Sequence, residues 1–263
     1  MAVCVRISAL LNVRPSLNTR SAQYLRPICA QETRRLQKPI ELNVSEQRRT
    51  FASRVIIEET LGKQILRQIR SLLRRPKMKV PPYDHICQVG DPILRGQSSP
   101  VDPRQIKSAE IQNVIRTMVK QMRKVRAVGC AAPQVGVAKQ IIVMELTKRH
   151  LKWFDEEVLK ARECKVFPLK VFINPQVKVV DPRVVTFLEG CMSLCGYDAC
   201  VPRAYGVQIT GLNEKGEEVS WRTTGYAARI IQHEVDHLRG KLFIDTMDPL
   251  TFLDKEWPKW NIK

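Results

Sequence analysis

The pentapeptide His233-Glu234-Val235-Asp236-His237 combines two metal-ligand side chains with a carboxylate. On a helix, residues four apart share a face, so both imidazoles can reach one metal ion. Glu234 lies about 100° further round such a helix and can touch a water molecule beside the ion. The pattern predicts a metal-dependent hydrolase with Glu234 as general base. The alternative is a pair of ordinary histidines on an interaction helix.

The HExxH pattern does not by itself supply a third ligand. The metzincin pattern continues with Gly and then His, and here Gly240 fits but Phe243 occupies the histidine position. A downstream carboxylate is the other known solution, and the candidates share no clear helical face: Asp245, Asp248, Asp254 and Glu256. An upstream thiolate is therefore the better candidate.

The segment Glu189-Gly190-Cys191-Met192-Ser193 offers such a thiolate at the end of an apolar stretch. Gly190 permits an unusual backbone angle or a close approach, which lets Cys191 aim its sulfur at a metal. Cys-His-His ligation leaves the fourth tetrahedral position for water, as in a catalytic rather than a structural zinc site.

Two further cysteines, Cys195 and Cys200, raise the alternative of a Cys-only structural site. Their spacing and the lack of a fourth nearby cysteine argue against it, so both are expected in the core. The eight cysteines follow no regular spacing, and a chain of this length can bury a core without disulfides. A reducing compartment is therefore expected.

A third motif, Val128-Gly129-Cys130-Ala131-Ala132-Pro133-Gln134, is dense in small residues. Small residues let the backbone approach a bound group closely, and the Gln134 amide can donate to a developing oxyanion. The alternative is a Gly/Ala turn that carries a surface glutamine.

Helices and strands that position these motifs are predicted from the hydrophobic periodicity. A long helix is expected over Asp102–Arg126, with Asp102 as its cap, and another over Gly225–Arg239, ended by Gly240. The expected strands are Ile141–Leu146, Val171–Ile173, Val184–Leu188, and a hairpin of Val207–Leu212 with Glu218–Arg222. The prediction is an α+β fold, with mainly antiparallel sheets around a central HExxH metal-binding helix and a long N-terminal helix in the catalytic domain.

Composition and charge separate the chain into two regions. The 263 residues are 44% hydrophobic and 27% charged, as in globular proteins, and no apolar run is long enough for a membrane span. The net charge is +18, but residues 1–80 hold 17 basic and five acidic residues. The remaining chain is only mildly basic, so no specific nucleic-acid binding is expected.

The N-terminal region has the composition of a mitochondrial transit peptide. It contains four arginines and no acidic residue before Glu32. We predict a transit peptide over residues 1–40, a basic linker or amphipathic helical extension over residues 41–79, and a catalytic domain over residues 80–263. Apolar spacing within the extension indicates a helix over residues 56–75.

The order of the three motifs, GxAAPQ, EGCxS and HExDH, resembles that of the peptide deformylases. The resemblance covers most of the chain from Val80 to about Asp248, and the leader and an insertion-like segment at 149–170 resemble the mitochondrial type of animals. Three positions differ from the usual family pattern. Ala127 stands for Gly, Cys130 for Leu, and Met192 for the Leu of bacterial members.

The resemblance implies removal of the formyl group from the N-terminal formyl-methionine of nascent, mitochondrially made proteins. Cys191, His233 and His237 would bind a divalent ion, with Fe²⁺ favoured and Zn²⁺ or Co²⁺ as replacements. Glu234 would be base and acid. Gln134 and the Met192 backbone N–H would stabilise the oxyanion.

The resemblance also assigns substrate contacts and partners. Five residues would bind the formyl-methionyl chain: Val128, Gly129, Leu188, Gly190 and Ile230. The expected location is the mitochondrial matrix, with the mitochondrial ribosome and a second copy of the chain as further expected partners. Two competing hypotheses are another metal-dependent amidase or peptidase with the same ligands, and a non-enzymatic mitochondrial RNA- or ribosome-binding protein.

Overall fold

The computed structural model describes residues 63–64 and 79–261 of the chain. The predicted transit peptide and most of the predicted 56–75 helix lie outside the described residues, although Lys63 and Gln64 are helical. None of the helices in the described part is long and apolar enough to cross a membrane.

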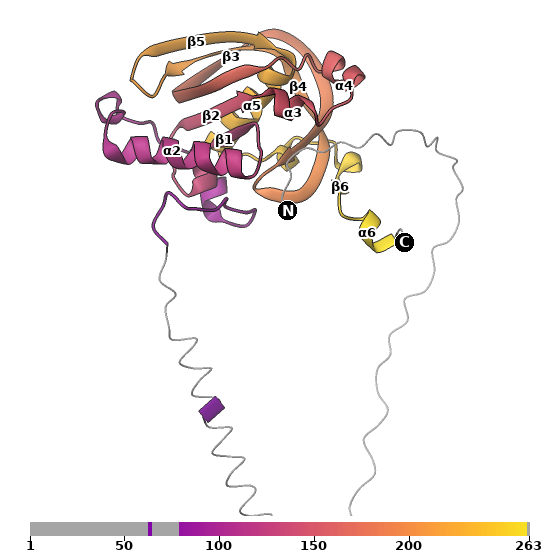
Figure 1. The fold of residues 1–263 in the computed structure, drawn as a ribbon, viewed down its shortest axis with the longest axis horizontal. Helices are drawn as coiled ribbons and strands as arrows, with labels where there is room; N and C mark the ends of the chain where they lie inside the picture. Colours follow the sequence, from indigo (N-terminus) through magenta and orange to yellow (C-terminus); the bar gives the residue numbers. More distant parts are fainter. Residues whose placement is uncertain (1–62, 65–78, 262–263) are drawn as a thin grey trace, which may run out of the picture. The chain divides into compact units, whose positions relative to one another are not determined.

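The strands form an antiparallel sheet in the order β1-β2-β3-β4-β5, with β6 paired to β4 (Figure 1). Their bounds are Gly129–Ala131 (β1), Ile141–Leu146 (β2), Phe167–Cys191 (β3), Leu194–Leu212 (β4), Glu218–Thr224 (β5) and Leu253–Asp254 (β6). The prediction of mainly antiparallel pairing is confirmed.

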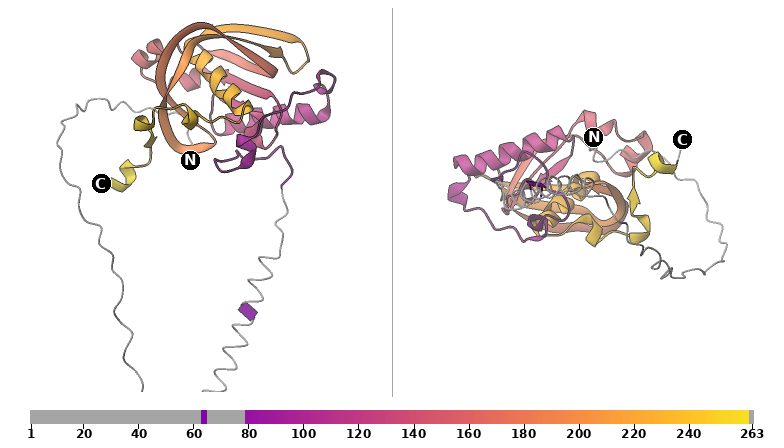
Figure 2. Two further views of the ribbon diagram at one scale, coloured as in Figure 1. Left: turned by 180° about the vertical axis from the view of Figure 1, so that it is seen from behind. Right: turned by 90° about the horizontal axis from the view of Figure 1, so that it is seen from below.

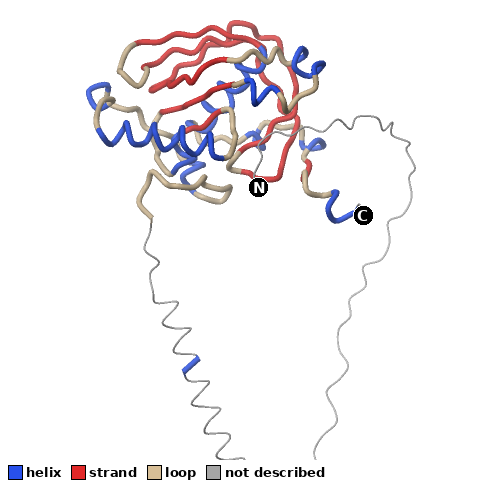
Figure 3. Tube along the Cα trace, viewed as in Figure 1, coloured by secondary structure: helices blue, strands red, loops and turns tan. Residues whose placement is uncertain are grey.

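Most of the helices are short (Figure 3). The α-helices are Ala109–Lys124 (α2), Lys148–Leu151 (α3), Glu156–Ala161 (α4), Gly225–Leu238 (α5) and Pro258–Asn261 (α6). Short 3-10 helices cover Pro92–Arg95 (η1), Pro103–Gln105 (η2), Ala132–Val135 (η3), Phe243–Asp245 (η4) and Pro249–Thr251 (η5).

Strand β2 lies between two apolar layers, which explains why all six of its residues are buried. Ile142 and Met144 point to a core formed with α5, whereas Ile141 and Val143 point to a core formed with α2. Successive side chains of a strand face opposite sides of a sheet, so this alternation places α2 and α5 on opposite faces.

The predicted helix over Asp102–Arg126 is wrong at its start. Asp102 caps only the short helix η2, where its side chain accepts from the Arg104 N–H. Helix α2 begins afterwards, and its own cap is Ser108, whose hydroxyl accepts from the Ile111 N–H at 3.3 Å. Two capping residues lie in sequence here, and the second one starts the long helix.

The predicted separate strands Val171–Ile173 and Val184–Leu188 are parts of one strand, β3. The register of β3 shifts near Pro175 and near Pro182, while the pairing with β4 continues. Such bulges absorb residues that cannot donate to the ladder and bend the strand. The bent β3–β4 pair curves around α5 (Figure 2).

Candidate metal centre

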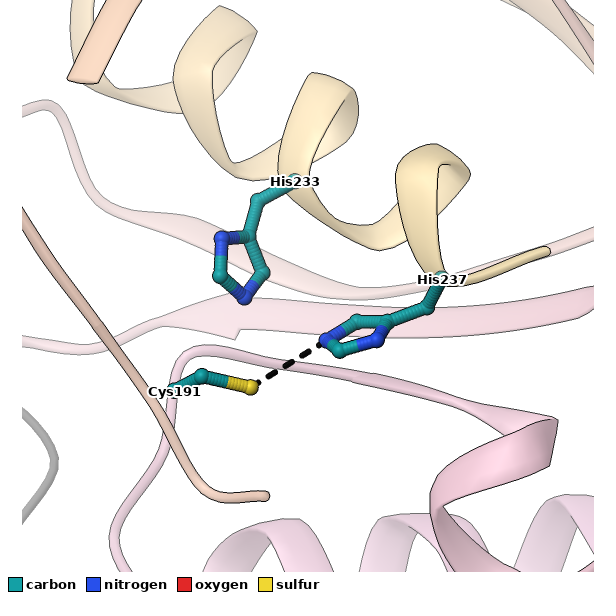
Figure 4. Close-up of side chains that lie close together, drawn as sticks. All are labelled: Cys191, His233 and His237. Atoms are coloured by element: carbon teal, nitrogen blue, oxygen red, sulfur yellow. Dashed lines mark hydrogen bonds between the residues drawn. The ribbon is translucent and has the colours of Figure 1, made fainter. Parts of the chain in front are cut away.

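Three side chains of metal-ligand type converge between α5 and the end of β3 (Figure 4). The ligand atoms of Cys191, His233 and His237 all lie within 4.8 Å of one another. Cys191 Sγ is 3.2 Å from His237 Nε2. The fold therefore brings the predicted triad together, although Cys191 lies 46 positions before His237 in the sequence.

Helix α5 presents both histidines because its apolar face is buried against the sheet. Ile231, Val235 and Leu238 recur at helical spacing and belong to the core. The helix covers Gly225–Leu238, so it ends one residue before the predicted end, and Gly240 has the positive φ of +70° typical of a residue that follows a helix.

The donor set fits a divalent transition-metal ion. Burial by itself raises the pKa of the Cys191 thiol, but the imidazoles of His237 and His233 outweigh it and hold the pKa well below its usual range. A buried thiolate beside two imidazoles is the ligand set that suits Zn²⁺, Fe²⁺ or Co²⁺.

A buried charge network orients His233. The His233 ring nitrogen Nδ1 lies 3.0 Å from Glu189 Oε2, so an N–H there donates to the carboxylate and leaves Nε2 free for a metal. Glu189 also accepts from Arg203 at 3.0 Å and from Arg229 at 2.7 Å. Arg203 continues the network to Asp236.

The sequence motifs predict no role for Glu189, Arg203, Arg229 or Asp236. One signal was present: Arg229 interrupts the apolar face of a helix that is otherwise expected to be buried. A buried arginine requires a partner, but only the folded chain shows that this partner is Glu189.

Glu234 is buried beside the triad without contributing a ligand atom to it. Only 4% of Glu234 is exposed, and its Oε2 has no hydrogen-bond partner among the described residues. Burial raises the pKa of the Glu234 carboxyl to about 7, against the lowering effect of His233 and His237. A carboxyl with such a pKa can both accept and release a proton near neutral pH.

The Gln134 amide is held in one orientation by the backbone. Its Oε1 accepts from the Ala131 N–H at 2.9 Å, which leaves Nε2 to donate. Nε2 lies 3.5 Å from Cys191 Sγ and 3.2 Å from Ser193 Oγ. Gln134 is 1% exposed, so the alternative of a surface glutamine is wrong.

One pocket, with about 480 Å³ of empty space, opens onto these groups. All five predicted substrate contacts line it: Val128, Gly129, Leu188, Gly190 and Ile230. Glu234, Gln134, Met192, Cys191 and His233 line it as well. Four further lining residues had no predicted role in the site: Ala127, Glu189, Tyr226 and Arg229. The pocket therefore joins an apolar wall to the candidate catalytic groups.

Comparison with known proteins agrees with this geometry. Residues 83–252 match the polypeptide deformylase family. This chain belongs to the peptide deformylase family. The mitochondrial peptide deformylase of Homo sapiens is 46% identical over 201 residues, which are 76% of this chain and 82% of the human protein. The resemblance drawn from the three motifs is confirmed.

Two solved peptide deformylase structures are similar to this chain. The enzyme of Synechococcus elongatus, in complex with actinonin, is 32% identical, covers 67% of this chain and 84% of its own, and has a TM-score of 0.53. The Met-Ala-Ser-bound class I type b enzyme of Acinetobacter baumannii is 28% identical and has a TM-score of 0.56. The match covers 65% of this chain and 100% of the bacterial chain.

The departures of this deformylase-family chain from the usual motif fit the local packing. Cys130 is fully buried in the α2 core, where a thiol replaces the usual leucine, and Ala127 packs in the same core. Met192 lies in that core too and is 6% exposed. These residues keep the apolar character of the positions that they occupy.

The expectation that Cys195 and Cys200 lie in the core is wrong. Cys195 is exposed and Cys200 is partly exposed. Both follow the tight turn between β3 and β4, where Cys191 pairs with Leu194, and the alternation after this turn points Cys195 outward. The Cys195 thiol donates to the Met192 carbonyl at 3.2 Å.

Proposed function

We propose that this protein removes the formyl group from the N-terminal formyl-methionine of nascent polypeptides and releases formate. One observation carries the proposal: the buried Glu234 carboxyl lies beside the Cys-His-His cluster, and Glu234, Cys191 and His233 line the same pocket. Family membership supports the same reaction.

Cys191, His233 and His237 would hold the divalent ion. Fe²⁺ is the favoured ion, and Zn²⁺ or Co²⁺ would suit the same ligands. When bound, such an ion supplies Lewis acidity, which makes a water molecule more acidic and polarises a carbonyl.

Glu234 moves the protons of the reaction. Its carboxylate accepts a proton from the water that attacks the formyl carbon. The same carboxyl then gives the proton to the leaving amine as the C–N bond breaks, so that formate and a free N-terminus result. The raised pKa of about 7 suits both steps.

Two hydrogen-bond donors, one from each of two sequence motifs, stabilise the oxyanion. Gln134 Nε2 is already aimed at the cluster, because Ala131 fixes the orientation of the amide. The backbone N–H of Met192, the residue after the Cys191 ligand, is the second donor. Donors held in place before the reaction stabilise the developing charge without reorganisation.

The substrate backbone would pair with strand edges on both sides of the pocket. Gly129 lies in the edge strand β1, with Val128 directly before it, and Leu188 and Gly190 lie in the part of β3 that does not pair with β2. Such pairing does not depend on side chains, which suits an enzyme that meets many N-termini. Ile230 and Tyr226 would contact the methionine side chain. The Met-Ala-Ser-bound relative supports a methionine-first peptide as ligand.

A metal analysis combined with a formyl-Met-Ala-Ser hydrolysis assay tests this function. Glu234→Ala should retain stoichiometric metal and lose deformylation by roughly 10²-fold or more. Loss of the metal together with the activity would show that Glu234 is a ligand. Hydrolysis of acetyl-Met-Ala-Ser at a similar rate would favour another amidase or peptidase instead.

We further propose that residues 1–40 direct the protein to the mitochondrial matrix, that residues 41–79 are a linker or helical extension, and that residues 80–263 form the catalytic domain. The mitochondrial relative and the basic, acid-poor leader support this division. Binding to the mitochondrial ribosome and self-association into a homodimer stay predictions.

A truncated chain that starts near Val80 tests this division. It should hydrolyse short formyl-Met peptides and, in cells, should fail to enter mitochondria. An unfolded truncated chain would show that residues 41–79 belong to the core. Continued import would place the targeting information elsewhere.

A further inference from the structure

A second cavity lies next to the candidate active site. It contains about 710 Å³ of empty space, and it shares Cys191 and Met192 with the first pocket. The other lining residues come from the start of the catalytic domain, α2, the β3–β4 turn region and the C-terminal segment: His85, Ile86, Gln88, Gln121, Lys124, Val125, Cys195, Gly196 and Lys255.

Met192 lines both cavities, and hydrogen bonds hold its backbone in place. Its carbonyl accepts from Gln88 Nε2 at 3.0 Å and from the Cys195 thiol at 3.2 Å. In the proposed complex, the formyl group of the substrate contacts Met192 and the methionine side chain fills the first pocket. The Cα of the second residue then lies only about 3.8 Å from the Cα of this methionine. The second residue of the substrate is therefore close enough to enter the second cavity.

The lining of this second cavity is mostly apolar, and its ionisable side chains other than cysteine are all basic. No Asp or Glu is among its lining residues. Two of its three basic residues already have acidic neighbours, since His85 contacts Asp84 at 3.3 Å and Lys255 pairs with Asp198 at 2.9 Å.

Lys124 is different, because it forms no ion pair with any residue in the described part of the chain. It lies exposed in the last turn of α2 and contributes to the wall of the cavity. An unpaired ammonium group at a cavity without carboxylates favours an anionic occupant.

We propose that Lys124 is a specificity-determining residue that binds an acidic side chain at the second position of the formyl-methionyl substrate. The proposal rests on the proposed function, since it deepens the choice of substrate by the same site. Because Lys124 is exposed, the attraction is of the strength of a surface ion pair and is weakened by salt.

Three peptides that differ only at the second position test this inference: formyl-Met-Glu-Ser, formyl-Met-Gln-Ser and formyl-Met-Lys-Ser. With the full-length, metal-loaded protein at low ionic strength, kcat/KM should fall in that order, by about threefold at each step. The kcat/KM of formyl-Met-Glu-Ser should therefore exceed that of formyl-Met-Lys-Ser by about tenfold, and this Glu-to-Lys ratio should shrink at high salt.

Two charge-reversal variants on the same helix complete the test. Lys124→Glu should remove or invert the Glu-to-Lys ratio. Arg116→Glu, two turns away and absent from the cavity wall, should keep it. The ratio is taken within each variant, so the fraction of active protein cancels. Lys124→Gln, which introduces no new charge, should bring the ratio close to one.

Equal kcat/KM values for the three peptides, or a ratio that Lys124→Glu leaves unchanged, would overturn the inference. Hydrolysis of all three peptides at equal rates would leave the proposed deformylase function intact. Failure to hydrolyse any of them would instead contradict the proposed function itself.

Discussion

The α-carbon of Gly129 packs directly against the carboxyl group of Glu234. A Cβ on Gly129 would lie 2.3 Å from Glu234 Oε1 and 2.7 Å from Cδ. Gly129 therefore leaves the space that the Glu234 carboxyl, the proposed general base, occupies, in addition to the proposed contact of Gly129 with the substrate backbone. This contact joins the first motif to the third.

Gly129→Ala should lower kcat by roughly 10²-fold, because the added methyl group displaces the Glu234 carboxyl from the site. Metal content should stay stoichiometric, since the variant touches none of the three ligands. Gly96→Ala is the matched control, because the nearest atom to its Cβ would be 3.7 Å away. A Gly129→Ala protein with full activity would show that Glu234 can relocate without loss.

Cys191→Ser should bind metal far more weakly than the parent protein, because a neutral hydroxyl is a poor ligand compared with a thiolate. Cys195→Ser is the control: it is exposed, and a serine can also donate to the Met192 carbonyl. Metal analysis after dialysis distinguishes the two. An emptied site in Cys195→Ser with a loaded site in Cys191→Ser would refute the ligand assignment.

Glu189→Gln should weaken metal affinity by about 10- to 100-fold, because the His233 ring loses the carboxylate that orients it. Competition with a chelator measures this affinity. Glu163→Gln is the control, since Glu163 accepts from Tyr205 and Thr224 but contacts no candidate ligand. Equal metal affinity in the two variants would contradict the orienting role.

Glu145→Gln should destabilise the protein near neutral pH by about 1 kcal/mol. Hydrogen bonds from Arg123, at 2.9 and 2.7 Å, hold the pKa of the Glu145 carboxyl below its ordinary value of 4.5. The Glu145 carboxyl therefore binds fewer protons in the folded state than in the unfolded state. The Arg123–Glu145 pair contributes its full stabilisation above the unfolded-state pKa, and this contribution is lost as the pH falls through the folded-state pKa.

Urea unfolding as a function of pH tests this linkage. The free-energy difference between the parent protein and Glu145→Gln should be largest at about pH 7 and should shrink as the pH falls below about 4. Glu218→Gln, at an exposed strand position, is the control and should show little difference at either pH. A difference that grows on acidification would be inconsistent with a stabilising Arg123–Glu145 pair.

Local patterns in the sequence determined the chemistry of the site. The four-residue spacing of His233 and His237 places both imidazoles on one helical face wherever that helix packs. The hairpin of Val207–Leu212 with Glu218–Arg222 was also predicted, because its turn residues and alternation act within a few residues. Such features depend on neighbours along the chain, which the sequence displays directly.

Only the tertiary structure decided what surrounds these groups. The β3–β4 bend brings Cys191 to His237, and the packing of α5 buries Glu189 between Arg203 and Arg229. The exposure of Cys195 likewise follows from the turn that precedes it. Burial, pKa values and long-range partners arise from contacts between segments far apart in sequence, and no local periodicity records which segments will meet.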